Sequence, residues 1–168
     1  EIEIAKSLQR KLEAPGALDN VPFANNKIRL LEILINDKCP LIGIKLNELT
    51  KKFPKLDANI IGVIRNDKFV TLKKNDVMLK DDKAYVAINA SQMQETLNSF
   101  GHHEKISNKI LIIGGGNIGF NLAKSLEETF DSARVKIIEK DKERAELIAS
   151  ELNNTIIING NGLDEEVL

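Results

Sequence analysis

The stretch "KILIIGGGNIGF", residues 109–120, decides the fold because it joins an apolar run to a glycine-rich turn and then to a helical pattern. The run "KILII" has the continuous hydrophobicity that is typical of a parallel strand covered on both faces. After the glycines, apolar residues recur at intervals of four, as on the buried face of a helix; they are Ile118, Leu122, Leu126 and Phe130. The stretch therefore predicts a strand, a tight turn and a helix in direct succession.

A second strand, a second helix and a third strand follow along the chain. "RVKII", residues 134–138, and "TIII", residues 155–158, have the composition of strands. Between them, Asp141 predicts the start of a helix, whose apolar face we expect to hold Ala145, Ile148, Ala149 and Leu152. The order β-α-β-α-β is half of a doubly wound dinucleotide-binding fold, so the predicted fold class is α/β with a Rossmann-like parallel sheet.

The glycine spacing Gly114-x-Gly116-x-x-Gly119 has a chemical interpretation in this context. Gly114 allows the tight turn, Gly116 lets the backbone approach a pyrophosphate, and Gly119 lets the helix pack closely on the strand. The N–H groups near Asn117 and Ile118 would lie at a helix N-terminus, which favours an anion. The alternative is a flexible turn that holds no ligand.

Three further residues are candidates for the adenosine side of this site. Glu139 lies 20 positions after Gly119 and ends the second strand, where a carboxylate accepts hydrogen bonds from ribose hydroxyls. It would repel a 2′-phosphate, which favours NAD or NADH over NADP, although the adjacent Lys140 weakens that preference. Asn161, in "NGNG" after the third strand, either lines the adenosine side or only forms a turn. The alternative for Glu139 is a solvated surface charge.

Residues 27–100 predict a compact α+β unit of β-α-β-β-β-α order. Its expected elements are strands at "KIRLLEILI" (27–35), "NIIGVIR" (59–65), "KFVTL" (68–72) and "KAYVAI" (83–88), a helix over 46–53, and a helix capped by Ser91 that ends at Gly101. Asn66-Asp67 predicts a tight hairpin turn. Asp81-Asp82 would either bind a cation or, the favoured alternative, form an exposed charge pair.

Two segments flank this unit. Residues 1–14 predict a helix with Ile4, Leu8 and Leu12 on one apolar face, which we expect to pack against another domain of a longer protein. Residues 101–108 predict a polar linker. Its two histidines, His102 and His103, are metal-ligand candidates, but a solvated linker is the favoured interpretation because adjacent side chains point apart on an extended chain.

The composition excludes several classes of protein. The 168 residues carry 24 basic and 25 acidic side chains, a net charge of -1, which disfavours binding to nucleic acid. The single Cys39 forms no internal disulfide, fits a buried apolar filler and favours a reducing compartment such as the cytoplasm. No Ser/His/Asp or Cys/His set is evident, so a binding module is favoured over an enzyme; the alternative is a fragment of an NAD-dependent oxidoreductase.

Several stretches resemble the RCK/KTN family of potassium-transport proteins, the TrkA type in particular. "ILIIGGGNIGFNLAKSLE", "VKIIEKDKERAELIASEL" and "TIIINGNGLDEEVL" resemble its NAD-binding domain, and residues 27–98 resemble its C-terminal domain. The resemblance implies three parts: a terminal helix of a preceding nucleotide-binding domain (1–20), an RCK C-terminal-type domain (21–100), and the N-terminal part of a second nucleotide-binding domain (101–168). The chain would then be a central piece of a tandem protein.

The resemblance also implies a site and a role. The phosphate loop of the family is matched by Gly114, Gly116, Asn117, Ile118 and Gly119, and its ribose-binding acid by Glu139. Gly160-Asn161 departs from the Gly-Asp that is frequent in the family. The implied protein is a cytoplasmic, peripheral regulatory subunit at the inner face of the membrane. It would bind NAD or NADH, with ATP and ADP as further candidates, and form a homo-oligomer, a dimer or tetramer, on a TrkH/TrkG-like potassium transporter subunit.

Overall fold

The computed structural model describes residues 1–130 and 132–164, and the chain divides into two compact units. The first consists of Glu1–Leu12 with Ile106–Leu168, and we call it the parallel unit. The second consists of Glu13–Lys105, and we call it the antiparallel unit. Each unit has its own hydrophobic core.

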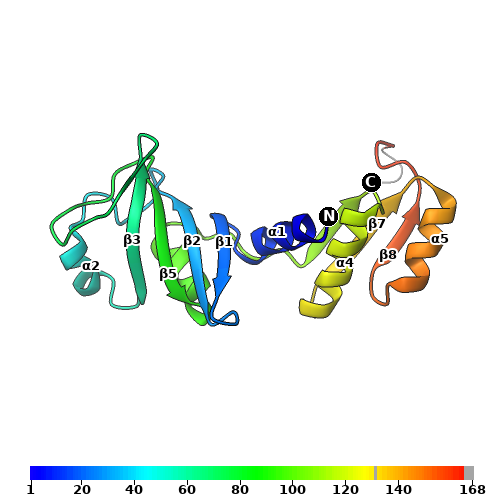
Figure 1. Ribbon diagram of the computed structural model, residues 1–168, viewed down its shortest axis with the longest axis horizontal. Helices are drawn as coiled ribbons and strands as arrows, with labels where there is room; N and C mark the ends of the chain where they lie inside the picture. Colours follow the sequence, from blue (N-terminus) through cyan, green and yellow to red (C-terminus); the bar gives the residue numbers. More distant parts are fainter. Residues whose placement is uncertain (131, 165–168) are drawn as a thin grey trace. The chain divides into compact units, whose positions relative to one another are not determined.

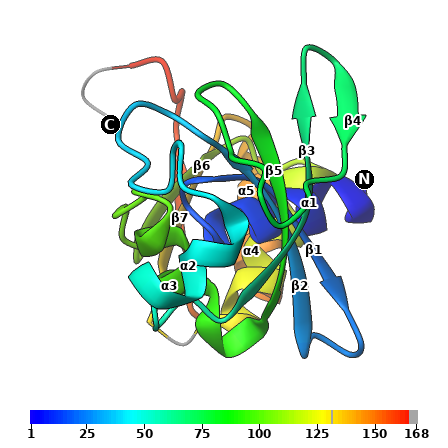
Figure 2. The same cartoon turned by 90° about the vertical axis from the view of Figure 1, so that its left-hand side faces the viewer.

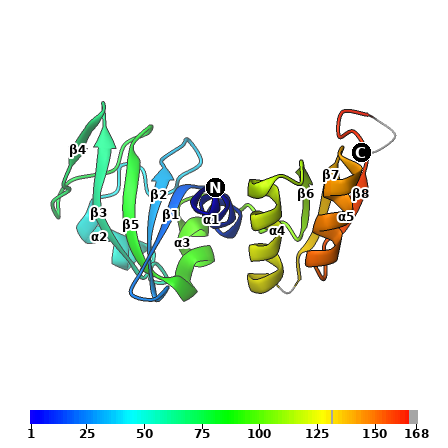
Figure 3. The ribbon, with the colours of Figure 1, turned by 45° about the vertical axis from the view of Figure 1, so that its right-hand side comes forward.

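The parallel unit has the predicted β-α-β-α-β order. Its elements are β6 (Lys109–Ile113), α4 (Asn117–Thr129), β7 (Arg134–Glu139), α5 (Lys142–Glu151) and β8 (Ile156–Asn159). The three strands are parallel in the order β6-β7-β8. Because both crossovers advance in the same direction, right-handedness puts both helices on one face of the sheet, as Figures 1 and 3 show. The predicted Rossmann-like half-fold is confirmed.

The opposite face of this sheet departs from the prediction that "KILII" is covered on both sides. Among the described residues, the helices cover only one face, so burial along β6 alternates. Leu111 is 46% exposed and Ile113 is 60% exposed. The continuous apolar run therefore predicted the strand correctly but not the coverage of its second face. Ala149, expected on the apolar face of α5, is likewise exposed.

Helix α1 (Ile2–Glu13) packs on α4 through a face that differs from the predicted one. Ala5 and Gln9 are buried, and Gln9 exchanges two hydrogen bonds with α4: its amide donates to the Thr129 hydroxyl at 2.9 Å, and the Ser125 hydroxyl donates to its carbonyl oxygen at 2.5 Å. Ile4 is 50% exposed, whereas the predicted face had it buried. The two hydrogen bonds of the buried Gln9, which periodicity does not detect, fix the rotation of this helix.

The antiparallel unit is one sheet with helices on one side, as Figure 2 shows. Its elements are β1 (Ala17–Phe23), β2 (Ile28–Leu34), α2 (Leu46–Lys52), β3 (Ala58–Arg65), β4 (Lys68–Val70), β5 (Lys83–Asn89), the 3-10 turn η1 (Ala90–Gln92) and α3 (Met93–Ser99). The strand order is β1-β2-β5-β3-β4. The predicted helix at 46–53 and the β3–β4 hairpin are confirmed, and Asn66 and Asp67 both have positive φ, as the tight turn requires.

Two local features of this unit were not predicted. β1, over which no strand was predicted, pairs with β2. The predicted cap Ser91 lies inside η1, and the Asn89 carboxamide accepts the hydrogen bond from the Ser91 N–H at 3.1 Å.

Asp82 is buried, which contradicts the predicted exposed charge pair. It is 1% exposed and accepts two hydrogen bonds from the Arg65 guanidinium, at 2.8 and 2.7 Å, and one from the Leu79 N–H at 2.8 Å. Burial alone would raise the pKa of Asp82, but these hydrogen bonds and the Arg65 charge outweigh it and lower the pKa. Asp81 is exposed, so the pair divides between interior and solvent.

His102 is also buried, which contradicts the solvated linker for this residue. Its side chain is 8% exposed, and its Nε2 lies 3.2 Å from the carbonyl oxygen of Leu34. His103 is exposed, as expected. Cys39 is buried as predicted, and burial raises the pKa of its thiol.

Candidate functional site

The predicted phosphate loop lies between the end of β6 and the start of α4. Gly114 has φ +100°, a conformation that favours glycine, and its N–H donates to the Ile138 carbonyl at 2.8 Å. α4 begins at Asn117, and its N-cap, Gly116, provides no side-chain cap. The first N–H groups of a helix have no partner within it, so this end of α4 can receive an anion.

Two glycines of the loop face different surroundings. A Cβ at Gly119 would overlap the carbonyl oxygen of Gly114 and lie 3.1 Å from the Ile112 side chain, so only glycine allows α4 to pack this closely. A Cβ at Gly116 would have nothing within 4 Å. A phosphate-binding loop of this type requires both features: close packing of the helix at Gly119 and open space for the ligand at Gly116.

A cavity of about 400 Å³ opens beside this loop. All five predicted loop residues line it, namely Gly114, Gly116, Asn117, Ile118 and Gly119, together with apolar side chains of β6, α1 and α4. The Asn117 amide donates to the Glu1 carboxylate at 2.9 Å, so an anionic group already lies against the start of α4. Such a position suits negative charge because the helix macrodipole is positive at this end.

Glu139, at the end of β7, is bonded directly to the loop. Its Oε2 accepts from the Gly115 N–H at 2.6 Å, and its Oε1 accepts from the Asp141 N–H at 2.8 Å. The Asp141 hydrogen bond, followed by that of Gly115, lowers the pKa of Glu139 despite partial burial. The carboxylate is therefore ionised at neutral pH and held in one orientation.

Lys140 and Asn161 do not line the cavity. The Lys140 side chain is exposed, and its carbonyl accepts from the Asn159 amide at 3.1 Å. The Asn161 amide donates to the Asp164 carboxylate at 3.2 Å, and its own carbonyl oxygen accepts from the Leu163 N–H at 3.3 Å. Asn161 thus organises the turn after β8, and its role toward adenosine stays a prediction. The last part of "GLDEEVL", residues 165–168, lies outside the described residues.

Sequence reasoning missed two residues of the site, Gly115 and Arg144. A Cβ at Gly115 would approach the end of the Ile148 side chain and the Glu139 carboxylate, so the loop is tightly packed on this side. The Arg144 Nε donates to the Gly115 carbonyl at 2.9 Å. The one available signal for Gly115 was its position between two glycines of the motif. No local sequence pattern indicated a role for Arg144.

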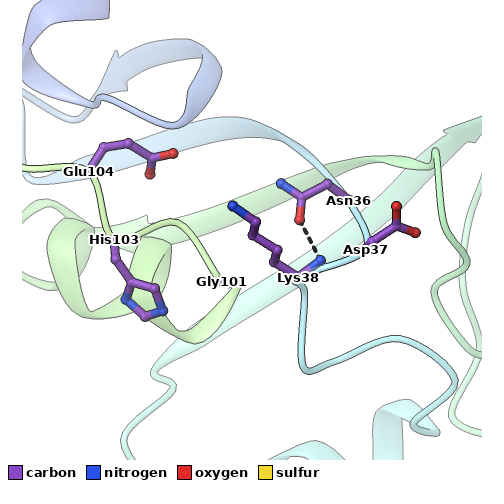
Figure 4. Close-up of a pocket in the computed structure, with 6 residues that line it drawn as sticks. All are labelled: Asn36, Asp37, Lys38, Gly101, His103 and Glu104. Atoms are coloured by element: carbon purple, nitrogen blue, oxygen red, sulfur yellow. Dashed lines mark hydrogen bonds between the residues drawn. The ribbon is translucent and has the colours of Figure 1, made fainter.

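A second cavity, of about 480 Å³, lies in the antiparallel unit and is shown in Figure 4. It is lined by Asn36, Asp37, Lys38, Gly101, His103 and Glu104. Asn36 accepts from the Lys38 N–H at 2.9 Å, and Asp37 pairs with Lys80 at 2.8 Å. Two of its polar groups are therefore engaged with the protein itself.

Neither a membrane-spanning helix nor a metal-binding cluster is present in the part of the chain that the structure describes. No helix within residues 1–130 and 132–164 has the length and apolar character needed to cross a bilayer. In the same residues, no three His, Cys, Asp or Glu side chains gather in a way that could hold a metal ion.

Comparison with known proteins matches the two units separately. The TrkA-C domain model matches residues 30–101, and the TrkA-N domain model matches residues 110–168. The Trk system potassium uptake protein TrkA of Azorhizobium caulinodans is 37% identical over 168 residues, which are 100% of this chain and 37% of that protein.

Solved structures share the fold at lower identity. The GsuK RCK domain aligns with a TM-score of 0.51 and 20% identity, covering 98% of this chain and 35% of that one. The GsuK channel bound to NAD aligns with a TM-score of 0.50 and 16% identity, covering 99% of this chain and 28% of that one. The fold is therefore that of an RCK-type α/β protein.

The two domain matches and the full-chain similarity identify the family. The chain belongs to the TrkA family, with a TrkA-C domain followed by TrkA-N sequence. It spans 37% of the length of the Azorhizobium relative.

Proposed function

We propose that this chain is part of a nucleotide-sensing regulatory subunit of a Trk-type potassium uptake system. In this proposal, NAD or NADH binds at the loop after β6, with ATP and ADP as competing ligands. Binding would shift a conformational equilibrium by the difference in its affinity for two states of the protein, and this shift would gate a membrane potassium transporter.

The observation that carries the proposal is the uncapped start of α4. The N–H groups at Asn117 and Ile118 lie beside a cavity, where a diphosphate would receive several hydrogen bonds at once. Glu139, ionised and bonded to the same loop, would accept from the ribose hydroxyls and repel a 2′-phosphate. This combination favours a dinucleotide over a simple anion.

The names of the relatives support the proposed association with a membrane potassium transporter. A Trk system potassium uptake protein matches the whole chain, and a structural neighbour is a channel bound to NAD. We propose by analogy a TrkH/TrkG-like membrane subunit, a homo-oligomer, and a peripheral location at the cytoplasmic face of the membrane. Residues 1–20 would end a preceding nucleotide-binding domain, 21–100 would form the C-terminal-type domain, and 101–168 would begin a second nucleotide-binding domain. The boundary at residue 20 falls inside β1 (Ala17–Phe23), which pairs with β2, so the preceding domain would end before this strand.

Calorimetric titration of NADH, NAD and ATP into the full-length protein tests the nucleotide site. We expect saturable binding that weakens by at least about tenfold in two variants. Gly116→Ala puts a methyl group where the backbone would approach the diphosphate, and Glu139→Gln removes a charged hydrogen-bond acceptor. Glu143→Gln, an exposed carboxylate on α5, is the matched charge control and should bind normally. Absence of binding by the unchanged protein would overturn the proposal.

The alternative is a fragment of an NAD-dependent oxidoreductase. A dehydrogenase requires an acid or base beside the nicotinamide, and no Ser/His/Asp or Cys/His set is evident in this sequence. Oxidation of bound NADH with any hydroxy or amino acid product would favour the oxidoreductase, whereas binding without turnover would favour the regulator.

A further inference from the structure

Two side chains hold the peptide groups on either side of Gly115 from opposite ends. Glu139 accepts from the Gly115 N–H at 2.6 Å, and Arg144 donates from its Nε to the Gly115 carbonyl at 2.9 Å. The first contact fixes the peptide between Gly114 and Gly115, and the second fixes the peptide between Gly115 and Gly116. Both contacts come from β7 and α5, outside the loop itself.

The contact with Arg144 decides where the next N–H group points. In a planar trans peptide, the carbonyl and the N–H point in opposite directions. Because Arg144 draws the Gly115 carbonyl toward itself, the Gly116 N–H faces away from Arg144. Gly116 also lines the cavity and has open space beside its Cα. A rotated peptide would present a carbonyl oxygen in place of this donor and repel a phosphate.

Arg144 is itself held in place by its surroundings. Its backbone N–H donates to the Asp141 cap at 2.8 Å, which fixes the first turn of α5. Its guanidinium lies 5.9 Å from the ring centre of Phe120 on α4, within range of a cation–π contact. The side chain therefore joins α5, the loop and α4, and can act as a rigid support.

We propose that Arg144 is a positioning residue of the nucleotide site, which orients the peptide between Gly115 and Gly116 so that its N–H serves the diphosphate. The inference rests on the proposed function for the identity of the ligand. The inference adds that the loop has its ligand-binding conformation before the ligand binds. The hydrogen bond from Arg144 on α5 maintains this conformation, and the charge of the arginine is not required.

Two variants separate the hydrogen bond from the charge. Gln places an amide nitrogen at the same point along the side chain as the arginine Nε, and Met fills similar space without a donor. We expect Arg144→Met to weaken NADH binding about tenfold and Arg144→Gln to stay within about threefold of the unchanged protein. Lys124→Met is the control, since the Lys124 ammonium lies 5.7 Å from the same Phe120 ring. It should bind normally.

A second readout needs no ligand. Amide exchange of Gly115, whose N–H donates to Glu139, is measured by NMR on the ligand-free protein; it should be faster in Arg144→Met, where the loop loses its support from α5, and close to normal in Arg144→Gln. Equal weakening of binding by the Met and Gln variants, or unchanged exchange in the Met variant, would overturn the inference. If the unchanged protein failed to bind NADH, the proposed function would fall, and the exchange comparison would still decide whether Arg144 orients the loop.

Discussion

The two units each hold an ionised carboxylate in a fixed orientation, but they do so in opposite ways. In the antiparallel unit, Asp82 is buried and its contacts include a bidentate pairing with Arg65. In the parallel unit, Glu139 is half-buried and held by the N–H groups of Gly115 and Asp141. One carboxylate is enclosed by its partners, whereas the other keeps part of its surface open beside a cavity-lining loop.

This difference distinguishes a charged side chain that stabilises the fold from one that is available to a ligand. In a buried ion pair, the two side chains use each other as hydrogen-bond partners and have no groups left for a ligand. Removing one of them therefore changes the stability of the protein. A carboxylate that orients backbone donors at a helix N-terminus leaves lone pairs available at the surface. Asp82 and Glu139 are both ionised carboxylates, but we expect substitution of Asp82 to lower stability and substitution of Glu139 to weaken ligand binding.

Breaking the enclosed pair should have the largest effect on stability. Asp82→Asn removes the carboxylate that pairs with Arg65, and we expect the free energy of unfolding of the antiparallel unit to fall by about 3 kcal/mol, because the buried position loses its charge-assisted hydrogen bonds with the Arg65 guanidinium and the Leu79 N–H. Urea denaturation followed by circular dichroism measures this loss. Asp81→Asn, at the adjacent exposed position, should change stability little. Equal effects of the two variants would show that burial does not distinguish them.

The second prediction compares two glycines of the loop. Gly119→Ala adds a methyl group that overlaps the Gly114 carbonyl, so we expect a loss of about 2 kcal/mol in the stability of the parallel unit, as for other overpacked sites. Gly116→Ala has open space and an ordinary φ of −64°, and should unfold like the unchanged protein. Thermal unfolding of both variants is the measurement. If Gly116→Ala were the less stable variant, the division into a packing glycine and a ligand-facing glycine would be wrong.

The sequence predicted those parts of the molecule whose determinants are local. Glycine spacing, the capping residue Asp141 and the hairpin at Asn66-Asp67 all act within a few positions, and each lies where expected. Glu139 lies at the end of β7, as predicted, because the length of a β-α-β unit fixes its distance from the loop; its role toward ribose stays a prediction.

The missed features depend on contacts between distant positions. Arg144 reaches Gly115 across 29 residues, and Arg65 reaches Asp82 across 17. The rotation of α1 depends on Gln9, whose partners on α4 lie more than a hundred positions away. No periodicity or motif encodes such pairs, so an exposed charge pair and a wrong helix face were predicted in their place.

The smallest effect should come from acid titration of Glu127 on α4, a half-buried carboxylate that holds the turn before β8. Its Oε1 accepts from the N–H groups of Asn154 and Thr155, at 2.7 and 2.6 Å. Burial would raise the pKa of Glu127, but the Thr155 hydroxyl and three backbone N–H groups outweigh it and lower the pKa.

Since the folded pKa lies below the unfolded one, the stabilisation by Glu127 is complete above about pH 4.3 and is lost as the pH falls through the folded value. Glu127→Gln should therefore cost about 1 kcal/mol at neutral pH and make unfolding of the parallel unit less sensitive to acid. Denaturation midpoints across the acidic range give the slope, and Glu128→Gln, exposed on the same helix, is the control. An unchanged acid slope in Glu127→Gln would mean that another carboxylate, with Glu139 the first candidate, carries the acid sensitivity of this unit.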